Sequence, residues 1–444
     1  MNKLFITNGT IIDIKTGNTF LGTVEIIDST ISAIHKGPFN ITGKHTVLDA
    51  TGKYLIPGLI DMHCHISEKF APYFVASGVT TVRNTAGNIT LLDSLINEPA
   101  SAPTPRIYSA DRMIDGSPGQ WGPTSFGNFV TDDVDMARAE VRRQVQAGAK
   151  FIKLYGWIKK EVMFAAIDEA QKYNLEVACD GMNSKELSIL DFAEAGVTWI
   201  EHISGFAQAL YPGWHPYVTD DIQQIDWHNT NEQAIQHICE KLLSYNVKLC
   251  PTLTIFDQSA NYPNHWSPNN YVMASIKNFP SLNEHWKENA KYIETIQDRI
   301  TVILPLIKKV ARMYYEMGGT VVTGTDTPAL IDTFPGMSLH RELDLFVEIG
   351  FSTFEALQAA TINAAKSIKL DDIGEIGVNK IADILILTNN PLDDIKNTQS
   401  IEWIIKGGHV YTPAELLTHI PTDEVFNQRL EEFIRKWEAT ETSQ

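Results

Sequence analysis

Two histidines stand one residue apart at the end of a short apolar segment, and their side chains could bind a metal ion. Residues 55–65 read LIPGLIDMHCH, in which a Pro-Gly pair breaks the chain before an apolar run. Such a run is typical of a buried parallel strand. Side chains alternate between the two faces of a strand, so His63 and His65 point the same way and Cys64 the other. Two imidazoles on one rigid edge supply half of the ligands of a metal site.

The histidine segment is the first of a regular series of predicted strands. From Gly58 onwards apolar strand patterns alternate with amphipathic stretches, which favours parallel βα units. Eight such units predict an α/β fold of the TIM (β/α)8 barrel type, whose active site lies at the carboxyl ends of its strands. The predicted barrel strands cover residues 59–65, 80–84, 106–110, 151–155, 176–180, 199–202, 248–253 and 321–326.

Polar or ionisable side chains lie in or at the ends of most of these predicted strands. The strand ends of a barrel open at one mouth, so these side chains are expected to meet there. Two long connections, residues 204–246 and 256–316, are rich in aromatic and turn-forming residues. Long loops in a compact domain are usually functional, so these two are expected to form lids or walls of a binding site, or else oligomer contacts. Loops 111–130, 205–246 and 256–316 are expected to set the substrate. The polar residues in question are His65, Asn84, Lys153, Asp180, His202 and Asp326.

Lys153 lies in the apolar segment FIKLY, where an unpaired ammonium group would be costly to bury. Three interpretations of this lysine stay open at the level of the residues. It pairs with a buried carboxylate, it is a desolvated nucleophile, or carbon dioxide carboxylates it. Carboxylation turns the cation into an anionic oxygen donor that can bridge two metal ions.

Both ends of the chain predict β-structure outside the barrel. Residues 2–56 alternate with a period of two and contain an Asn-Gly turn, and residues 373–416 return to the same pattern. We therefore predict a small β-sandwich from residues 1–57 and 373–416, a barrel over residues 58–372 and a C-terminal helix within residues 417–444. One face of that helix is apolar and is expected to dock on the body or on a partner. Its residues are Phe426, Leu430, Phe433 and Trp437.

Composition excludes several classes of protein. The chain has 444 residues, of which 43% are hydrophobic, enough for a large core, and a formal net charge of −18. That charge argues against nucleic acids and anionic membranes as partners. The absence of a long apolar run or a secretory cleavage pattern predicts a cytoplasmic protein. Four scattered cysteines form neither a zinc ribbon nor a disulfide framework. We expect a small-molecule substrate and a homo-oligomer.

The segment PGLIDMHCH resembles the first barrel strand of the amidohydrolase superfamily, and the resemblance extends over nearly the whole chain. The segment FIKL resembles the fourth strand of its prolidase-like, imidazolonepropionase-related members, in which the lysine is carboxylated. WIEH resembles the sixth strand with its histidine ligand, and TGTDTP the eighth strand with its aspartate. The resemblance implies that one or two divalent ions, most often zinc, are held by His63, His65, Lys153, His202 and Asp326.

The fifth strand departs from this resemblance. Relatives carry a metal-binding histidine there, whereas this chain has Asp180. Either Asp180 replaces the histidine as a ligand, or it is a partner of the ligands and the second metal is weak or absent. A carboxylate ligand lowers the Lewis acidity of the site and favours manganese or iron relative to zinc. The mononuclear deaminases of the superfamily need both the fifth-strand histidine and a His-x-x-Glu proton shuttle, and this sequence has neither.

The resemblance implies hydrolysis of an amide or peptide C–N bond in a small substrate such as a dipeptide or an N-acyl amino acid. A metal-bound hydroxide would attack the carbonyl, and Asp326 would act as general base and then as general acid. The alternatives are a mononuclear hydrolase, a lactonase or esterase, and a barrel that binds a ligand or metal without turnover.

Three further residues are candidates for contact with the substrate. Arg83 could hold a substrate carboxylate by a bidentate pair, or it could belong to a structural salt bridge. Gln120 falls in the third loop, where prolidase-like relatives often have a histidine that touches the substrate, and Tyr155 ends the fourth strand. His340 is predicted to be structural. The histidines predicted to lie at the surface are His215, His228, His265 and His285.

Overall fold

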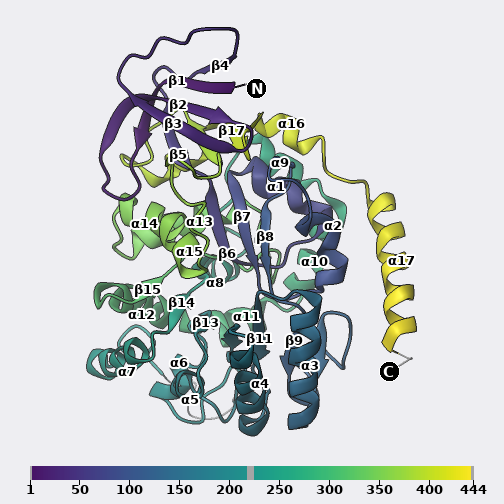
Figure 1. Ribbon diagram of the computed structural model, residues 1–444. Coiled ribbons are helices and arrows are strands. Elements are labelled where there is room, and N and C mark those ends of the chain that lie inside the picture. Colours follow the sequence, from purple (N-terminus) through teal and green to yellow (C-terminus); the bar gives the residue numbers. More distant parts are fainter. Residues whose placement is uncertain (1–2, 218–224, 442–444) are drawn as a thin grey trace.

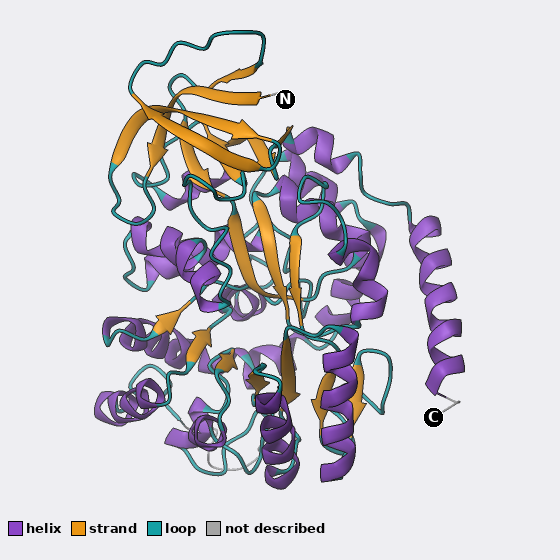
Figure 2. Ribbon diagram, viewed as in Figure 1, coloured by secondary structure: helices purple, strands orange, loops and turns teal. Residues whose placement is uncertain are grey.

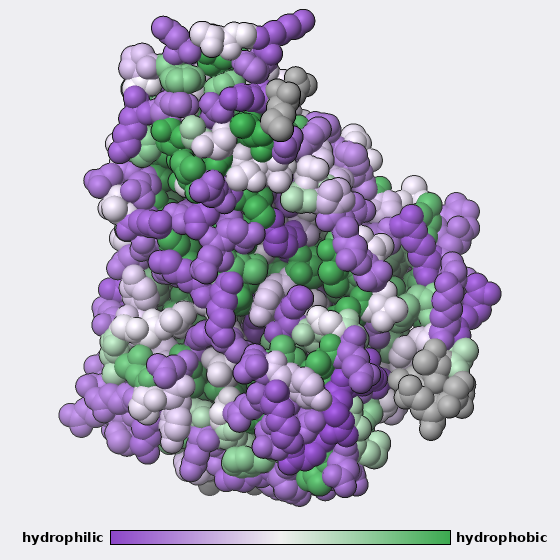
Figure 3. Space-filling view, viewed as in Figure 1, coloured by the Kyte–Doolittle hydropathy of each residue, from purple (hydrophilic) through white to green (hydrophobic). Residues whose placement is uncertain are grey.

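The computed structural model describes residues 3–217 and 225–441, which form an α/β protein. A mixed β-sheet lies at one end, and parallel strands surrounded by helices make up the rest (Figures 1 and 2). No helix in the described part of the chain is long and apolar enough to cross a membrane. The exterior of the face shown in Figure 3 is mostly hydrophilic, with scattered hydrophobic side chains.

The mixed sheet is a single sheet that contains strands from both ends of the chain. Its order is β18-β17-β16-β5-β1-β2-β3, with β4 paired to β1, so β5 and β16 join the N-terminal and C-terminal segments. Alternating apolar side chains of both segments, among them Ile6, Val24 and Ile384, form a separate buried cluster. The strands are β1 (Lys3–Ile12), β2 (Thr19–Ile27), β3 (Thr30–Lys36), β4 (Thr46–Asp49), β5 (Tyr54–Pro57), β16 (Ile384–Leu387), β17 (Ile401–Lys406) and β18 (His409–Tyr411).

A strand is present at each of the eight predicted places between residues 59 and 326, but the last one ends at Val321, so the predicted strand 321–326 is mostly wrong. With β9 and β10, which were not predicted, these strands form two parallel sheets, β6-β7-β8 and β10-β9-β11-β12-β13-β14-β15. The strands are β6 (Leu59–Cys64), β7 (Val79–Asn84), β8 (Arg106–Ser109), β9 (Met113–Asp115), β10 (Asn128–Val130), β11 (Phe151–Tyr155), β12 (Glu176–Asp180), β13 (Trp199–Glu201), β14 (Lys248–Cys250) and β15 (Thr320–Val321).

Backbone hydrogen bonds connect both edges of the sheet β6-β7-β8 to the longer parallel sheet. The Met62 N–H donates to the Thr323 carbonyl at 3.0 Å, beside the end of β15, and Cys64 forms a bridge with Thr327. On the other side, the Lys150 N–H donates to the Ser109 carbonyl at 2.8 Å, between β8 and β11. The chain between residues 322 and 327 therefore runs beside β6, which brings the segment around Asp326 to the two histidines.

Side chains on one face of these strands form a common interior. Phe151, Ala178 and Trp199 belong to one buried cluster, whereas their neighbours Ile152, Val177 and Ile200 belong to the outer core beneath the helices. Because side chains alternate along a strand, the residues two positions further on lie on the same inner face. They are Lys153, Asp180 and Glu201, at or close to the carboxyl ends of β11, β12 and β13.

Local sequence signals set the bounds of several helices. The Asp133 side chain accepts hydrogen bonds from the first turn of α3, and Ser188 forms a capping box with Asp191 at the start of α5. Gly148 and Gly196 end these two helices in the left-handed conformation, which glycine adopts without steric cost. The helices of the first half are α1 (Ala71–Ala76), α2 (Ile89–Ile96), α3 (Val134–Ala147), α4 (Lys160–Lys172), α5 (Ile189–Ala195), α6 (Phe206–Leu210) and α7 (Glu232–Ser244), with the 3-10 turn η1 (Glu68–Phe70).

The long connections were predicted from their aromatic and turn-forming residues, but much of their length is helical. The segment after β14 begins a helix directly at Leu253, so the predicted strand 248–253 is too long. Apolar residues at helical spacing, such as Leu282 and Trp286 in α10, bury one side of these helices. The helices are α8 (Leu253–Ala260), α9 (Tyr271–Lys277), α10 (Pro280–Ala290), α11 (Ile293–Arg299), α12 (Leu304–Glu316), α13 (Ser338–Glu348), α14 (Thr353–Ala359), α15 (Ile362–Ser367) and α16 (Pro413–Leu417), with η3 (Thr301–Ile303) and η4 (Ile395–Gln399).

The C-terminal helix α17 (Asp423–Glu441) lies along one side of the body (Figure 1). Lys69 forms an ion pair of 2.9 Å with Asp423. The Phe433 and Trp437 rings lie edge-on to Phe126, with ring centroids 5.9 and 6.3 Å apart. The apolar face predicted for this helix therefore contacts the body of the same chain.

Candidate metal centre

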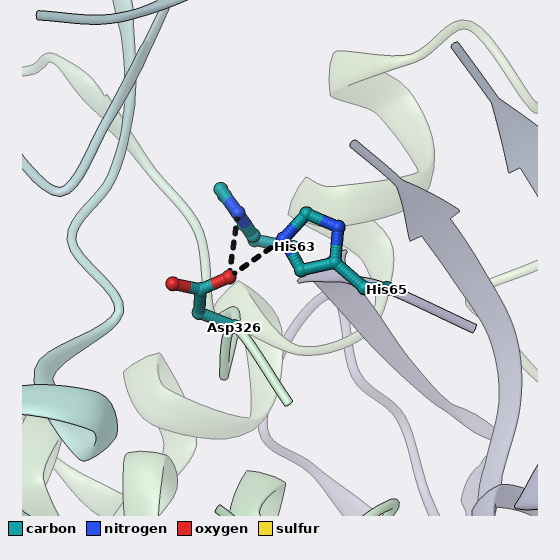
Figure 4. Close-up of side chains that lie close together, drawn as sticks. All are labelled: His63, His65 and Asp326. Carbon is teal, nitrogen blue, oxygen red and sulfur yellow. Dashed lines mark ion pairs between the residues drawn. The ribbon is translucent and has the colours of Figure 1, made fainter. Parts of the chain in front are cut away.

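His63, His65 and Asp326 lie together although they are far apart in the sequence (Figure 4). Asp326 Oδ1 is 3.2 Å from His63 Nε2 and 2.9 Å from His65 Nε2. The two imidazoles thus point to the same side, as the strand alternation predicted. Gly324 makes this approach possible, since a Cβ atom there would lie 2.8 Å from the His63 Cβ and 2.4 Å from the Cys250 sulfur.

His202 and Asp180 complete the cluster from two neighbouring strands. His202 follows β13, and its Nε2 is 3.4 Å from Asp180 Oδ2 and 3.8 Å from Asp326 Oδ2. Its ring centroid is 4.7 Å from that of His63. Three imidazole Nε2 atoms and two carboxylates therefore surround one small volume, and this is the type of donor set that binds divalent transition metals.

The other ring nitrogen of two of these histidines is held by a buried partner. His63 Nδ1 lies 2.7 Å from Glu201 Oε2, and His202 Nδ1 lies 2.6 Å from Thr252 Oγ1. Such partners fix the orientation of a ring and leave its Nε2 facing the cluster, which is the arrangement usual for histidines that bind metals.

The backbone is strained at three of these positions. His202, Thr252 and Asp326 have φ angles of 60°, 47° and 56°, in the left-handed region that residues other than glycine seldom adopt. A residue held there costs on the order of 1–3 kcal/mol, and such residues cluster at functional sites. Here they follow strand ends and turn the side chains of His202 and Asp326 towards the cluster.

The charged residues of the cluster shift one another's pKa values. Burial alone would raise the pKa of Asp326, but His63, His65 and His202 outweigh it and hold that pKa well below its ordinary value. Burial lowers the pKa of His63, yet Glu201 and Asp326 raise it further, so the net shift is upward. A histidine whose pKa is raised keeps its proton up to a higher pH than a free imidazole does. Metal ligands give up such protons when an ion binds.

Lys153 lies on the same inner face and is 2% exposed. Its Nζ atom is buried, and within residues 3–217 and 225–441 it has no hydrogen-bond partner. Of the three interpretations, a hydrogen-bonded pair with a carboxylate is absent among these residues, although the charge of Lys153 helps to lower the pKa of the buried Glu201. A buried ammonium group without a partner is costly, so this atom is the clearest sign that the site is completed by a group from outside the chain.

A cavity of about 580 Å³ opens over the cluster. The polar residues of the cluster, including Lys153 and Asp180, lie in its lining. Gln120 and Tyr155, two of the residues predicted to contact substrate, also line it. His285, predicted to lie at the surface, is exposed at the cavity wall. Further lining residues are Met113, Trp121, Met182, Asn183, Tyr217, Ile255, Phe256, Asn289, Ile300, Pro328, Ala329 and Leu330.

Arg83, the remaining candidate for substrate binding, lies away from this lining. It is fully buried beneath the cluster, where its Nη1 donates to Glu201 Oε1 at 2.8 Å. Its guanidinium lies over the Phe151 ring at 4.1 Å and the Trp199 ring at 4.4 Å. Of the two roles considered from the sequence, the structure favours the structural salt bridge.

Sequence reasoning missed Glu201 and Thr252 as parts of the site. Glu201 is fully buried and contacts both Arg83 and His63. The charges of Arg83, Lys153 and His63 hold its pKa well below the ordinary value against the effect of burial. The sequence did contain a signal for this role, namely a glutamate inside the apolar strand WIEH. A carboxylate that is buried in such a strand needs polar partners. His340 is structural as predicted, with Nδ1 2.8 Å from Thr398 Oγ1.

Comparison with known proteins agrees with this geometry. A model of the amidohydrolase family matches residues 54–410. The chain belongs to the amidohydrolase family. Members of this family generally bind divalent metal ions, which agrees with the donor atoms gathered in the cluster.

Individual relatives are distant or match only in part. The ochratoxinase of Aspergillus niger is 23% identical over 329 residues, which are 70% of this chain and 55% of that protein. Adenine deaminase 2 of Rhizobium meliloti is 35% identical over 85 residues, 18% of this chain and 14% of that protein. The crystal structure of a putative prolidase from Bifidobacterium longum shares the fold, with a TM-score of 0.68 at 24% identity over 97% of this chain and 98% of that one. The chain thus spans about half or less of the length of these two curated relatives, and its substrate is a matter for proposal.

Proposed function

We propose that this amidohydrolase hydrolyses the amide C–N bond of a small molecule at a centre of one or two divalent metal ions. The observation that carries the proposal is the convergence of three histidine Nε2 atoms on Asp326 and Asp180, beside the unpaired Lys153. The proposal places this centre at the mouth of a (β/α)8 barrel. The hydrogen bonds that link both edges of the sheet β6-β7-β8 to the longer parallel sheet support that arrangement.

The residues fit a metal centre by their chemistry. We propose that His63, His65 and Asp326 hold one ion and that His202 and Asp180 hold a second. Lys153, carboxylated on Nζ, would supply the shared oxygen donor, which would account for its burial without a partner. Zinc is the proposed ion, with manganese or iron as alternatives because a carboxylate takes the place of a histidine. Such an ion, when bound, polarises a carbonyl and lowers the pKa of a water molecule.

The remaining chemistry belongs to the side chains of the chain itself. Asp326 stays ionised near neutral pH because its pKa lies well below the ordinary value. In the proposed mechanism this carboxylate accepts the proton of the attacking water and passes it to the leaving nitrogen. Glu201 and Thr252 keep His63 and His202 oriented, and Gln120 and Tyr155 contact the bound substrate from the cavity wall.

A metal and activity measurement on the purified full-length protein tests this proposal. Metal content is determined by mass spectrometry, and hydrolysis is measured on a panel of amides, dipeptides and N-acyl amino acids, with lactones and esters included. We expect bound divalent metal and turnover of at least one amide. Hydrolysis of lactones or esters alone would show that the protein is a lactonase or esterase instead. A protein that binds metal but cleaves no member of the panel would support a binding role.

Two variants address the number of ions. Lys153→Ala should abolish activity and reduce the metal content, whereas the exposed Lys159→Ala, which loses only an ion pair of 3.1 Å with Asp132, should leave both unchanged. Activity that survives Lys153→Ala would instead favour the mononuclear alternative. Asp180→His should keep or raise the metal content if Asp180 is a ligand. The cytoplasmic location and the homo-oligomer remain predictions from the sequence.

A further inference from the structure

We infer that the substrate presents a bulky, uncharged apolar group beside the bond that is cleaved, rather than the free carboxylate of a dipeptide or N-acyl amino acid. This inference rests on the proposed hydrolytic function and narrows its substrate class. Three observations carry it: an aromatic wall on one side of the cluster, an apolar wall on another, and the distribution of charge around them.

The first wall is an exposed tryptophan held on an anchored loop. Trp121 is 63% exposed and its ring lies 6.4 Å from that of Tyr155, at the end of β11. The buried Asp115 fixes the loop, because its carboxylate accepts the N–H groups of Gln120 at 2.7 Å and of Trp157 at 3.0 Å. A large ring that is exposed to solvent yet fixed at a cavity is typical of a surface that contacts a ligand.

The second wall stands beside His202. Phe256 is 2% exposed, and its ring centroid lies 6.3 Å from that of His202. It belongs to α8, whose first turn is fixed because Glu342 accepts the N–H groups of Leu253 at 3.0 Å and Thr254 at 2.7 Å. Ile255, from the same helix, also lines the cavity. Both walls are therefore preorganised, and preorganisation lowers the entropic cost of binding an apolar group.

The charges around the cavity disfavour a free carboxylate. Arg83 is engaged with Glu201 beneath the centre, and Lys153 is the one Lys or Arg among the described residues that line the cavity. Residues 218–224, which the structure does not describe, read VTDDIQQ and contain no basic residue. A carboxylate against the apolar walls would lose hydration without gaining a cationic partner. The net charge of −18 also slows the approach of anions.

A matched pair of compounds tests the inference on the metal-loaded enzyme. N-Benzoyl-3-methylbutylamine and N-benzoyl-leucine share the amide and the branched alkyl chain and differ by one carboxylate. Hydrolysis of the pair is followed by chromatography and binding by calorimetry, because binding does not depend on turnover. We expect kcat/KM and affinity to favour the neutral compound by at least tenfold. Equal or tighter binding of the acid would overturn the inference even if both are cleaved. Tighter binding of the neutral compound without cleavage of any amide would support the inference and contradict the proposed hydrolysis.

Variants of residues in the first wall test whether that wall causes the preference for the neutral compound. Trp121→Ala should weaken binding of the neutral compound about tenfold, whereas Tyr173→Ala, which removes an exposed ring at the end of α4, should not. Gln120→Arg adds a cation at the first wall and should shift the kcat/KM ratio towards the acid. Gln236→Arg makes the same change of charge on the exposed face of α7 and should leave the ratio as it is. Equal effects of the cavity variants and their controls would contradict the assignment.

Discussion

Replacing Glu201 by glutamine should destabilise the metal-free protein strongly although Glu201 is not itself a proposed metal ligand. Its carboxylate lies 2.8 Å from Arg83 Nη1 and 2.7 Å from His63 Nδ1, with both partners buried. Glutamine keeps the size of the side chain but leaves the Arg83 guanidinium without its counter-charge between the Phe151 and Trp199 rings. Removing one partner of a buried ion pair costs about 3–5 kcal/mol, and we expect a loss of that order.

A double-mutant cycle distinguishes this cause from a general defect in packing. Unfolding by urea is followed by circular dichroism for the single variants Glu201→Gln and Arg83→Met and for their combination, in chelator. The combination should cost clearly less than the sum of the two, because the guanidinium and the carboxylate charges are removed together. Glu288→Gln, at an exposed ion pair of 2.6 Å, is the control and should change little. Additive losses, or a loss below about 1 kcal/mol for Glu201→Gln, would refute the reasoning.

Other predictions concern the neighbouring side chains. Thr252→Val removes the 2.6 Å partner of His202 Nδ1 and should weaken metal binding about 10–100-fold in a chelator competition, whereas Thr252→Ser should not. Burial lowers the pKa of His340 to about 4, so the unfolded chain takes up a proton first as the pH falls below 6.5. Stability should therefore drop by up to about 3 kcal/mol between pH 6.5 and pH 4, and His340→Gln should remove that part of the pH dependence in acid titrations. Phe126→Ala should loosen α17 and speed its cleavage in limited proteolysis, because its ring contacts Phe433 and Trp437; unchanged cleavage would show that these contacts do not hold the helix.

The sequence predicted the parts of the fold that depend on local pattern. Each of the eight strands between residues 59 and 326 has an apolar run of strand length, and all are present in order. His63 and His65 could be placed on one side because strand alternation is strictly local. The long connections could not be predicted in the same way. Their helices bury aromatic side chains such as Trp286 against segments far away in the sequence, and helical spacing alone does not show which segment such a face will contact.

The supporting residues of the centre were harder to predict than its proposed ligands. A ligand such as His202 stands out because a histidine ends an apolar strand. Glu201, one position earlier, reads as the outward residue of the same strand until its partners are known. Its role depends on Arg83 and His63, which lie 118 and 138 positions away in the sequence. Arg83 was considered for substrate binding for the same reason, since only the fold shows that a carboxylate lies beside it.

Asp180, where the sequence departs from the family pattern, is held in the same way as two of the histidines. His63 and His202 each have one ring nitrogen tied to a buried partner and the other directed to the cluster. In Asp180, Oδ1 accepts the Met182 N–H at 2.9 Å, while Oδ2 lies 3.4 Å from His202 Nε2. One atom is therefore fixed by the protein and the other is directed inward. This parallel supports the proposal that Asp180 is a ligand, because its inward oxygen faces the same volume as the imidazole Nε2 atoms.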